Sequence, residues 1–230
     1  MSVVHLPVPV ATIGAPRRVA APGLLLPQTS TLSEIFAGNG RDAGAAGFAL
    51  AQASGDKPLL WVQDRMSILE TGRLYPPALD AGLIPPDLIH VEVRDAKAAL
   101  WAMEEGLRCA ALHAVVGEIW GNPKALDFTA TRRLAVAAER SGVAAVLLLF
   151  DAVPNLSGAR MRWHVASRPS PPHPHDSLAP GAPAWVLDLF KARGVPPGKW
   201  EAAHEADGLH LLSPVGDGQL AQEEARRPAA

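Results

Sequence analysis

The sequence has little cysteine and no long apolar run, and both shortages exclude classes of protein. Among its 230 residues a single cysteine, Cys109, excludes an internal disulfide and any cysteine-based metal cluster. Cys109 falls in a stretch with a helical pattern, where we expect it to be a small core residue. No apolar stretch reaches the roughly 18 residues that a membrane-spanning helix needs, so no membrane span is expected.

A strong net charge and a basic leader are missing as well. The chain carries 21 lysines and arginines against 23 acidic residues, a net charge of −2, which argues against a protein that coats DNA. The first residues lack a basic region, and Pro7 and Pro9 interrupt their apolar run, so we expect no signal peptide and a cytoplasmic protein. Hydrophobic residues make up 48% of the chain, enough for one well-cored globular domain.

Apolar runs alternate with helical patterns through the middle of the chain. Strands are expected at 32–36, 59–63, 88–93, 112–120 and 143–150, and helices at 43–54, 74–83, 97–109 and 127–140. Several strands are continuous apolar runs, which is typical of parallel strands covered on both faces. Shorter strands at 157–165, 185–190 and 209–212 follow. The predicted fold class is therefore α/β, with a mostly parallel sheet, helices on both faces and a C-terminal antiparallel extension.

Proline and glycine divide the chain into three parts. Five prolines without a sustained period mark residues 1–30 as a flexible N-terminal arm, and residues 213–230 are predicted to be a disordered tail. Residues 31–212 then form one α/β domain. Within it, the proline-, histidine- and serine-rich stretch 168–183 is predicted to be a mobile loop.

The most informative stretch is Leu32–Gly47, which reads LSEIFAGNGRDAGAAG. A short apolar strand leads into a glycine loop and then a small-residue helix, the layout that cradles phosphates on loop N–H groups and a helix N-terminus. A P-loop also needs a lysine followed by a hydroxyl residue. No lysine, serine or threonine lies between Gly38 and Gln52, so the scaffold is present without its phosphate-binding chemistry.

A second interpretation of the same loop is a dinucleotide site. Gly38, Gly40 and Ala43 fit the pattern GxGxx(G/A), and Asp64 ends the next strand about 21 residues after Ala43. The sequence offers no convincing hydride-transfer site to accompany this pattern. A dinucleotide-binding enzyme therefore stays an alternative, which stoichiometric NAD in the purified protein would support.

Charged residues at strand ends and on one strand are further candidates. Asp64 and Glu118 fall near the exposed carboxyl ends of their strands, where open α/β sheets place functional groups. Arg160, Arg162 and His164 alternate with apolar residues, so they share one strand face that could contact DNA phosphates. The alternative is an exposed sheet face with ordinary surface charges.

Motifs for metal or nucleophilic chemistry are missing. His173 and His175 flank a proline, but no further ligands stand at metal-binding spacing, so no metal site is expected. No GxSxG nucleophile motif is present. We therefore expect no cofactor and no catalytic residue.

The order of these pieces resembles the RecA-like ATPase core and, within it, the ImuA family of SulA-related accessory proteins. The resemblance spans about residues 32–200 and includes LSEIF, LLWVQD, and AVVGEIW at the place of a Walker B strand. Three stretches are more specific to the family: LWAMEE, the run from TRRL to AAERSGV, and RMRWHV.

The resemblance implies a role beside RecA, ImuB and an error-prone DnaE-type polymerase in SOS-induced translesion DNA synthesis and mutagenesis. It also implies which ATPase groups are lost. The phosphate-binding lysine would fall at Ala43, the Mg²⁺-binding hydroxyl at Gly44, and the water-activating carboxylate near Asp64, while Glu118 alone matches the Walker B acid. A non-catalytic, RecA-like adaptor is expected, and an NTPase with a non-standard site is the alternative.

Overall fold

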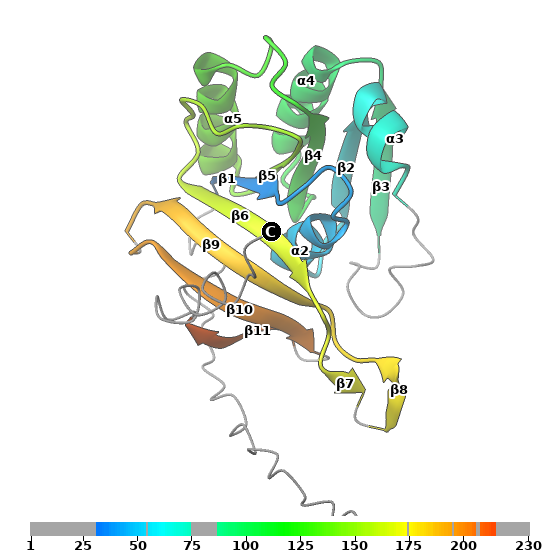
Figure 1. Cartoon of the computed structure of the whole chain (residues 1–230). Coiled ribbons are helices and arrows are strands. Elements are labelled where there is room, and N and C mark those ends of the chain that lie inside the picture. Colours follow the sequence, from blue (N-terminus) through cyan, green and yellow to red (C-terminus); the bar gives the residue numbers. More distant parts are fainter. Residues whose placement is uncertain are drawn as a thin grey trace, which may run out of the picture.

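The computed structural model describes residues 31–53, 55–74, 87–173, 175–194, 196–205 and 208–214. Their main feature is a nine-stranded mixed sheet with helices packed on both faces (Figure 1). The predicted arm at 1–30, the predicted helix at 74–83 except its first residue, and the part of the predicted tail beyond Pro214 lie outside the described residues.

Five parallel strands form one half of the sheet, as the continuous apolar runs predict. They are β1 (Leu32–Ala37), β2 (Leu59–Asp64), β3 (Leu88–Val93), β4 (Ala114–Trp120) and β5 (Ala144–Phe150). Their order across the sheet is β1-β5-β4-β2-β3, and every neighbouring pair is parallel. All five carboxyl ends therefore meet at one edge, and the loops after β1 and β2 open there.

Helices cover the two faces of this half through two separate hydrophobic clusters. Helix α2 (Gly44–Ala53) packs on one face, where Phe48 contacts the rings of Trp163 and Trp185. Helices α4 (Ala96–Leu107) and α5 (Phe128–Ser141) pack on the other face. An aspartate caps the start of each: Asp95 and Asp127 each accept a first-turn N–H.

One helix of this half is missing from the sequence prediction. Helix α3 (Arg65–Thr71) starts directly after β2, with no connecting loop. Asp64 is the last residue of β2 and also the N-cap of α3. A segment of seven residues is too short to show a helical apolar period, so the sequence gives little sign of it.

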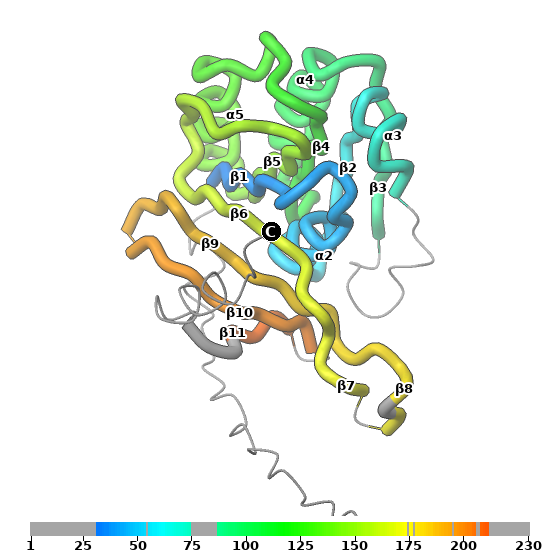
Figure 2. Tube along the Cα trace, viewed as in Figure 1, coloured from blue at the N-terminus to red at the C-terminus, as the bar shows by residue number. Residues whose placement is uncertain are grey.

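The C-terminal half adds four strands to the β1 edge. Strand β6 (Met161–Arg168) runs parallel to β1, and the antiparallel strands β9 (Ala184–Ala192), β10 (Gly198–Glu205) and β11 (Gly208–Pro214) follow it (Figure 2). The predicted α/β class with a C-terminal antiparallel extension is confirmed, and the architecture is consistent with a RecA-like core. Strand β11 also reaches two residues past the predicted domain boundary at 212.

Two smaller predictions are wrong. The stretch predicted to be a mobile loop contains a two-stranded hairpin of β7 (Pro172–His173) and β8 (Asp176–Pro180). Cys109 is exposed instead of buried, because α4 ends at Leu107 and Cys109 lies in the turn that follows it. In the part of the chain that the structure describes, no helix is both long enough and apolar enough to span a membrane.

Candidate functional site

A pocket lies at the carboxyl edge of the sheet, where the sequence places the phosphate-like loop. Its volume is about 380 Å³, and it is lined by the glycine loop, α3 and the ends of β2 and β4. The loop contributes Gly40, Arg41 and Ala43, and the opposite wall contributes Thr71 and Glu118. The structure thus brings together the degenerate loop and the degenerate Walker B acid that the sequence singles out.

The N–H group that opens helix α2 is bonded to a carboxylate of the chain itself. Gly44 donates its N–H to Asp42 Oδ1 at 2.9 Å. Asp42 Oδ2 accepts the Ser167 N–H from β6 at 2.8 Å, and the Ser167 hydroxyl also bonds to Asp42. Asp42 therefore places a negative charge at the helix start, the position where a P-loop attracts phosphate. Its charge repels any other anion there.

The next N–H groups of this turn are bonded to the backbone. Ala45 N–H donates to the Asp42 carbonyl at 3.4 Å, and Ala46 N–H donates to the Ala43 carbonyl at 3.1 Å. Gly47 N–H donates to the same Ala43 carbonyl at 3.2 Å. Because a phosphate cradle depends on unpaired N–H donors, the start of α2 offers few to a ligand.

Close packing accounts for two glycines of the loop. A Cβ at Gly40 would collide with the ring of Trp120, and a Cβ at Gly44 would collide with the Ser167 side chain. The Gly44 carbonyl also accepts the indole N–H of Trp185 at 2.6 Å. The loop glycines thus have structural roles that require no bound phosphate.

Glu118 is buried, and this corrects the expectation of an exposed strand end. Its side chain accepts the Thr71 hydroxyl at 2.7 Å and the Trp61 indole N–H at 3.2 Å. Burial raises the pKa of Glu118 above its ordinary value, and hydrogen bonds from Thr71, Gln63 and Trp61 offset this only in part. Glu118 is 3% exposed, and it thus favours its neutral form more than a free glutamate does.

A glutamine that the sequence analysis overlooked connects several segments of the pocket wall. Gln63 Nε2 donates to the Gly72 carbonyl at 3.1 Å, and its Oε1 accepts the Leu74 N–H at 3.1 Å. His90 Nε2 lies 2.8 Å from the same Oε1. Gln63 thus joins β2, β3 and the segment after α3. Its place at the end of a buried strand is the signal that could have identified it.

Asp64 has a structural role that differs from both functions suggested for it. Its Oδ1 accepts the Ser67 N–H at 2.8 Å and so caps α3. The residue is 3% exposed and does not line the pocket. A carboxylate held in this cap is not placed to activate a water for nucleotide hydrolysis, nor to bind the ribose of a dinucleotide, in that cavity.

The expected basic strand face is exposed only in part, because Arg162 is buried. Arg162 is 6% exposed, and its Nε lies 2.6 Å from Glu34 Oε2 on the neighbouring strand β1. Arg160 Nε donates to Glu139 Oε1 at 2.6 Å. His164 is exposed and stacks on Phe190. A buried, paired Arg162 is not presented to DNA phosphates, and a DNA contact at the half-buried Arg160 stays a prediction.

Among the described residues, no group of three histidine, cysteine, aspartate or glutamate side chains is arranged to hold a metal ion. Pro174, between the two histidines of interest, lies outside the described residues. The charged and polar groups that line the pocket are thus a buried carboxyl group, a hydroxyl, an amide and the charged side chains of Arg41, Glu70 and Arg73.

Comparison with known proteins places the chain in a family. No protein-family model matches it. It is similar to two curated proteins named Protein ImuA, from Caulobacter vibrioides strains NA1000 / CB15N and ATCC 19089 / CIP 103742 / CB 15. Each is 31% identical to it over 184 residues, which cover 74% of this chain and 71% of the relative. On this similarity, and with the fold described above, the chain belongs to the ImuA family.

Proposed function

We propose that this chain is a non-catalytic, RecA-like adaptor in SOS-induced translesion DNA synthesis and mutagenesis. It joins RecA, ImuB and, indirectly, an error-prone DnaE-type polymerase. Membership of the ImuA family supports the role in induced mutagenesis and the partnership with ImuB. The observation that carries the non-catalytic part is the Asp42 carboxylate, which takes the Gly44 N–H at the start of α2.

The physical argument rests on what phosphoryl transfer requires. Catalysis of this reaction is almost entirely positioning and electrostatic stabilisation of the phosphates by a lysine, a metal ion and N–H groups. Ala43 and Gly44 stand where the lysine and the metal-binding hydroxyl would be. Asp42 adds a negative charge at the same corner. A site with these three features should bind ATP poorly and hydrolyse it more poorly still.

One observation favours the rival hypothesis of an NTPase with a non-standard site. The pocket is preformed, and it contains both Glu118 and the hydroxyl of Thr71. However, a Walker B acid works as an ionised carboxylate, and burial shifts the pKa of Glu118 against ionisation. The adaptor hypothesis is therefore the better supported of the two.

Nucleotide binding and turnover separate these hypotheses. We expect calorimetric titration of the purified chain with ATP and Mg²⁺ to give no saturable heat at millimolar ATP. We expect any phosphate release to be the same in the wild type and in Glu118→Ala, because it would then come from a contaminant. Turnover that Glu118→Ala abolishes would overturn the non-catalytic proposal. Stoichiometric NAD released from the purified protein would instead favour the dinucleotide alternative.

A further inference from the structure

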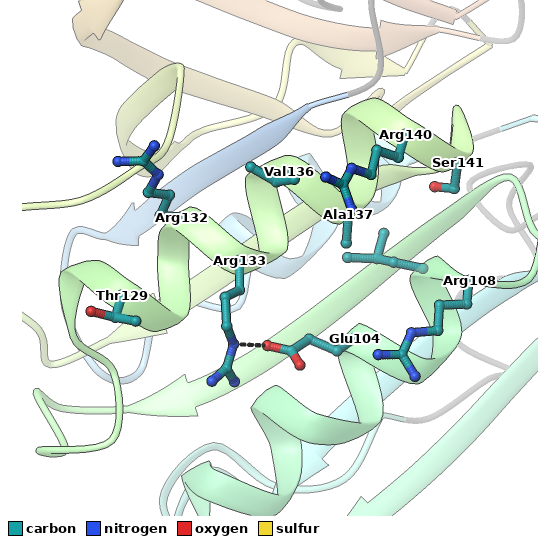
Figure 3. A pocket seen from close by; sticks show the side chains of 10 residues that line it. Glu104, Arg108, Thr129, Arg132, Arg133, Val136, Ala137, Arg140 and Ser141 are labelled. Carbon is teal, nitrogen blue, oxygen red and sulfur yellow. Dashed lines mark hydrogen bonds and ion pairs between the residues drawn. The ribbon is translucent and has the colours of Figure 1, made fainter.

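A second and larger cavity lies on the opposite face of the sheet from α2, along helices α4 and α5. Its volume is about 580 Å³. We call it the arginine groove and define it by Glu104 and Arg108, in and just after α4, and by Arg132, Arg133, Val136 and Arg140 in α5 (Figure 3). None of the sequence motifs that point to a phosphate site belongs to it.

The groove is strongly positive on a chain whose net charge is −2. Four arginines and one glutamate line it, and all four arginines are exposed. Arg133 Nε lies 2.6 Å from Glu104 Oε1, and Arg108 pairs with Glu105 at 2.7 Å. Within the described residues, Arg132 and Arg140 have no ion-pair partner. These two guanidinium groups are available to carboxylates of another molecule.

The groove has the length and the floor of a helix-binding surface. Its lining residues on α5 run from Thr129 to Ser141 at spacings of three and four, so they form one face of the helix. At the rise of an α-helix this face is about 18 Å long. Val136 and Ala137 are half-buried and provide apolar contact between the charged groups.

We propose that the arginine groove docks an acidic amphipathic helix of about three turns from a partner protein. Carboxylates of that helix would bond to Arg132 and Arg140, and its aliphatic side chains would rest on Val136 and Ala137. Arginine suits this task because its planar fork binds a carboxylate through two parallel hydrogen bonds. The inference rests on the proposed adaptor function only in requiring a protein partner.

Single-stranded nucleic acid fits the groove less well. Proteins that bind it without sequence preference combine positive charge with aromatic rings on which bases stack. None of the residues that line this groove is aromatic, and the exposed Trp101 of α4 is not among them. An apolar floor between arginines is a better match for leucine-like side chains than for a sugar–phosphate chain.

Fluorescence anisotropy with a defined probe tests the proposal. The probe is a fluorescein-labelled helical peptide of about 14 residues with glutamates and leucines on one face. We expect saturable binding to the full chain, and we expect Arg132→Gln with Arg140→Gln to weaken it by about tenfold or more. The matched control, Arg65→Gln with Lys97→Gln, removes the same charge from two exposed first-turn positions of α3 and α4 and should change binding by less than about threefold.

Several results of these binding measurements would overturn the proposal. No saturable binding by the wild type, an equal loss in the control pair, or equal binding of a peptide with glutamines in place of glutamates would each contradict it. So would tighter binding of an oligothymidine that the groove variant abolishes. Matching thermal midpoints of the variants would show that all of them are folded. Loss of ImuB and RecA binding with peptide binding intact would defeat the adaptor function and leave the groove proposal standing.

Discussion

At the scale of single residues, two carboxyl groups decide the character of the pocket. Asp42 accepts N–H groups from Gly44 and from Ser167, so the chain supplies its own anion at the start of α2. Glu118 accepts the Thr71 hydroxyl and the Trp61 indole N–H in a buried position. Neither group is arranged as in a phosphate site, where cationic and N–H donors face the ligand.

Burial of Glu118 predicts a dependence of stability on pH. Its raised pKa means that the folded state binds this proton more tightly than the unfolded state does. The resulting stabilisation is complete below the ordinary value of 4.5 and is lost as the pH rises through the folded pKa. Glu118→Gln cannot ionise, so its free energy of unfolding should rise relative to the wild type as the pH increases above about 4.5.

Urea denaturation at a series of pH values measures this difference. The variant Glu70→Gln, which removes an exposed carboxyl group from helix α3 next to Thr71, separates a general charge effect from the effect of burial. Altered hydrogen bonds to Thr71 and Trp61 would add the same offset at every pH, so only the change of the difference with pH is compared. A difference in the free energy of unfolding that stays constant or falls as the pH rises would contradict the assignment of a buried, readily protonated Glu118.

At the scale of elements, a buried ion pair ties the antiparallel extension to the parallel core. Glu34 of β1 and Arg162 of β6 lie directly opposite each other in the parallel register. The guanidinium also lies 5.3 Å from the ring centroids of Phe36 and Phe190, and Glu34 accepts the Ser157 hydroxyl. Several groups therefore depend on one carboxylate.

Removing that carboxylate should be costly. Glu34→Ala leaves a buried, unpaired arginine, and we expect it to lower the free energy of unfolding by about 3–5 kcal/mol. Arg94→Ala is the control, because the Arg94 side chain in its pair with Asp95 is 85% exposed, and it should cost less than about 1 kcal/mol. Guanidinium denaturation of the two variants compares them directly. Equal and small losses would mean that the buried pair does not anchor the extension.

The same elements show how far a sequence pattern reaches. Continuous apolar runs predicted the parallel strands, and helical apolar patterns predicted α4 and α5, because both signals are local. The contacts of Asp42 with Ser167 and of Arg162 with Glu34 join residues 125 and 128 positions apart. No local pattern reports such partners, so the burial of Arg162 could not be predicted from the alternation.

The glycine loop shows a different limit. Its glycines correctly predicted a strand–loop–helix corner, and the missing lysine was visible in the sequence. That Gly40 leaves room for the Trp120 ring, and Gly44 for Ser167, could not be read from spacing, because packing partners come from other strands. Helix α3 was missed because it follows β2 without a break.

At the scale of the whole molecule, two surfaces lie on different sides of one sheet. The pocket at the carboxyl edge has the position of a nucleotide site and lacks its lysine and hydroxyl. The arginine groove along α4 and α5 carries unpaired positive charge on an otherwise slightly acidic chain. A RecA-like shape that serves recognition instead of hydrolysis would account for both features.

Co-purification with the proposed partners tests this central claim most directly. The tagged full chain would be mixed with purified ImuB and RecA after nucleotide is removed with apyrase and EDTA. The adaptor proposal predicts that ImuB is retained without nucleotide and that RecA is retained together with ImuB. It also predicts that ATP does not increase the retention of ImuB. Failure to retain either partner, or retention of ImuB only when this chain has ATP available, would contradict it.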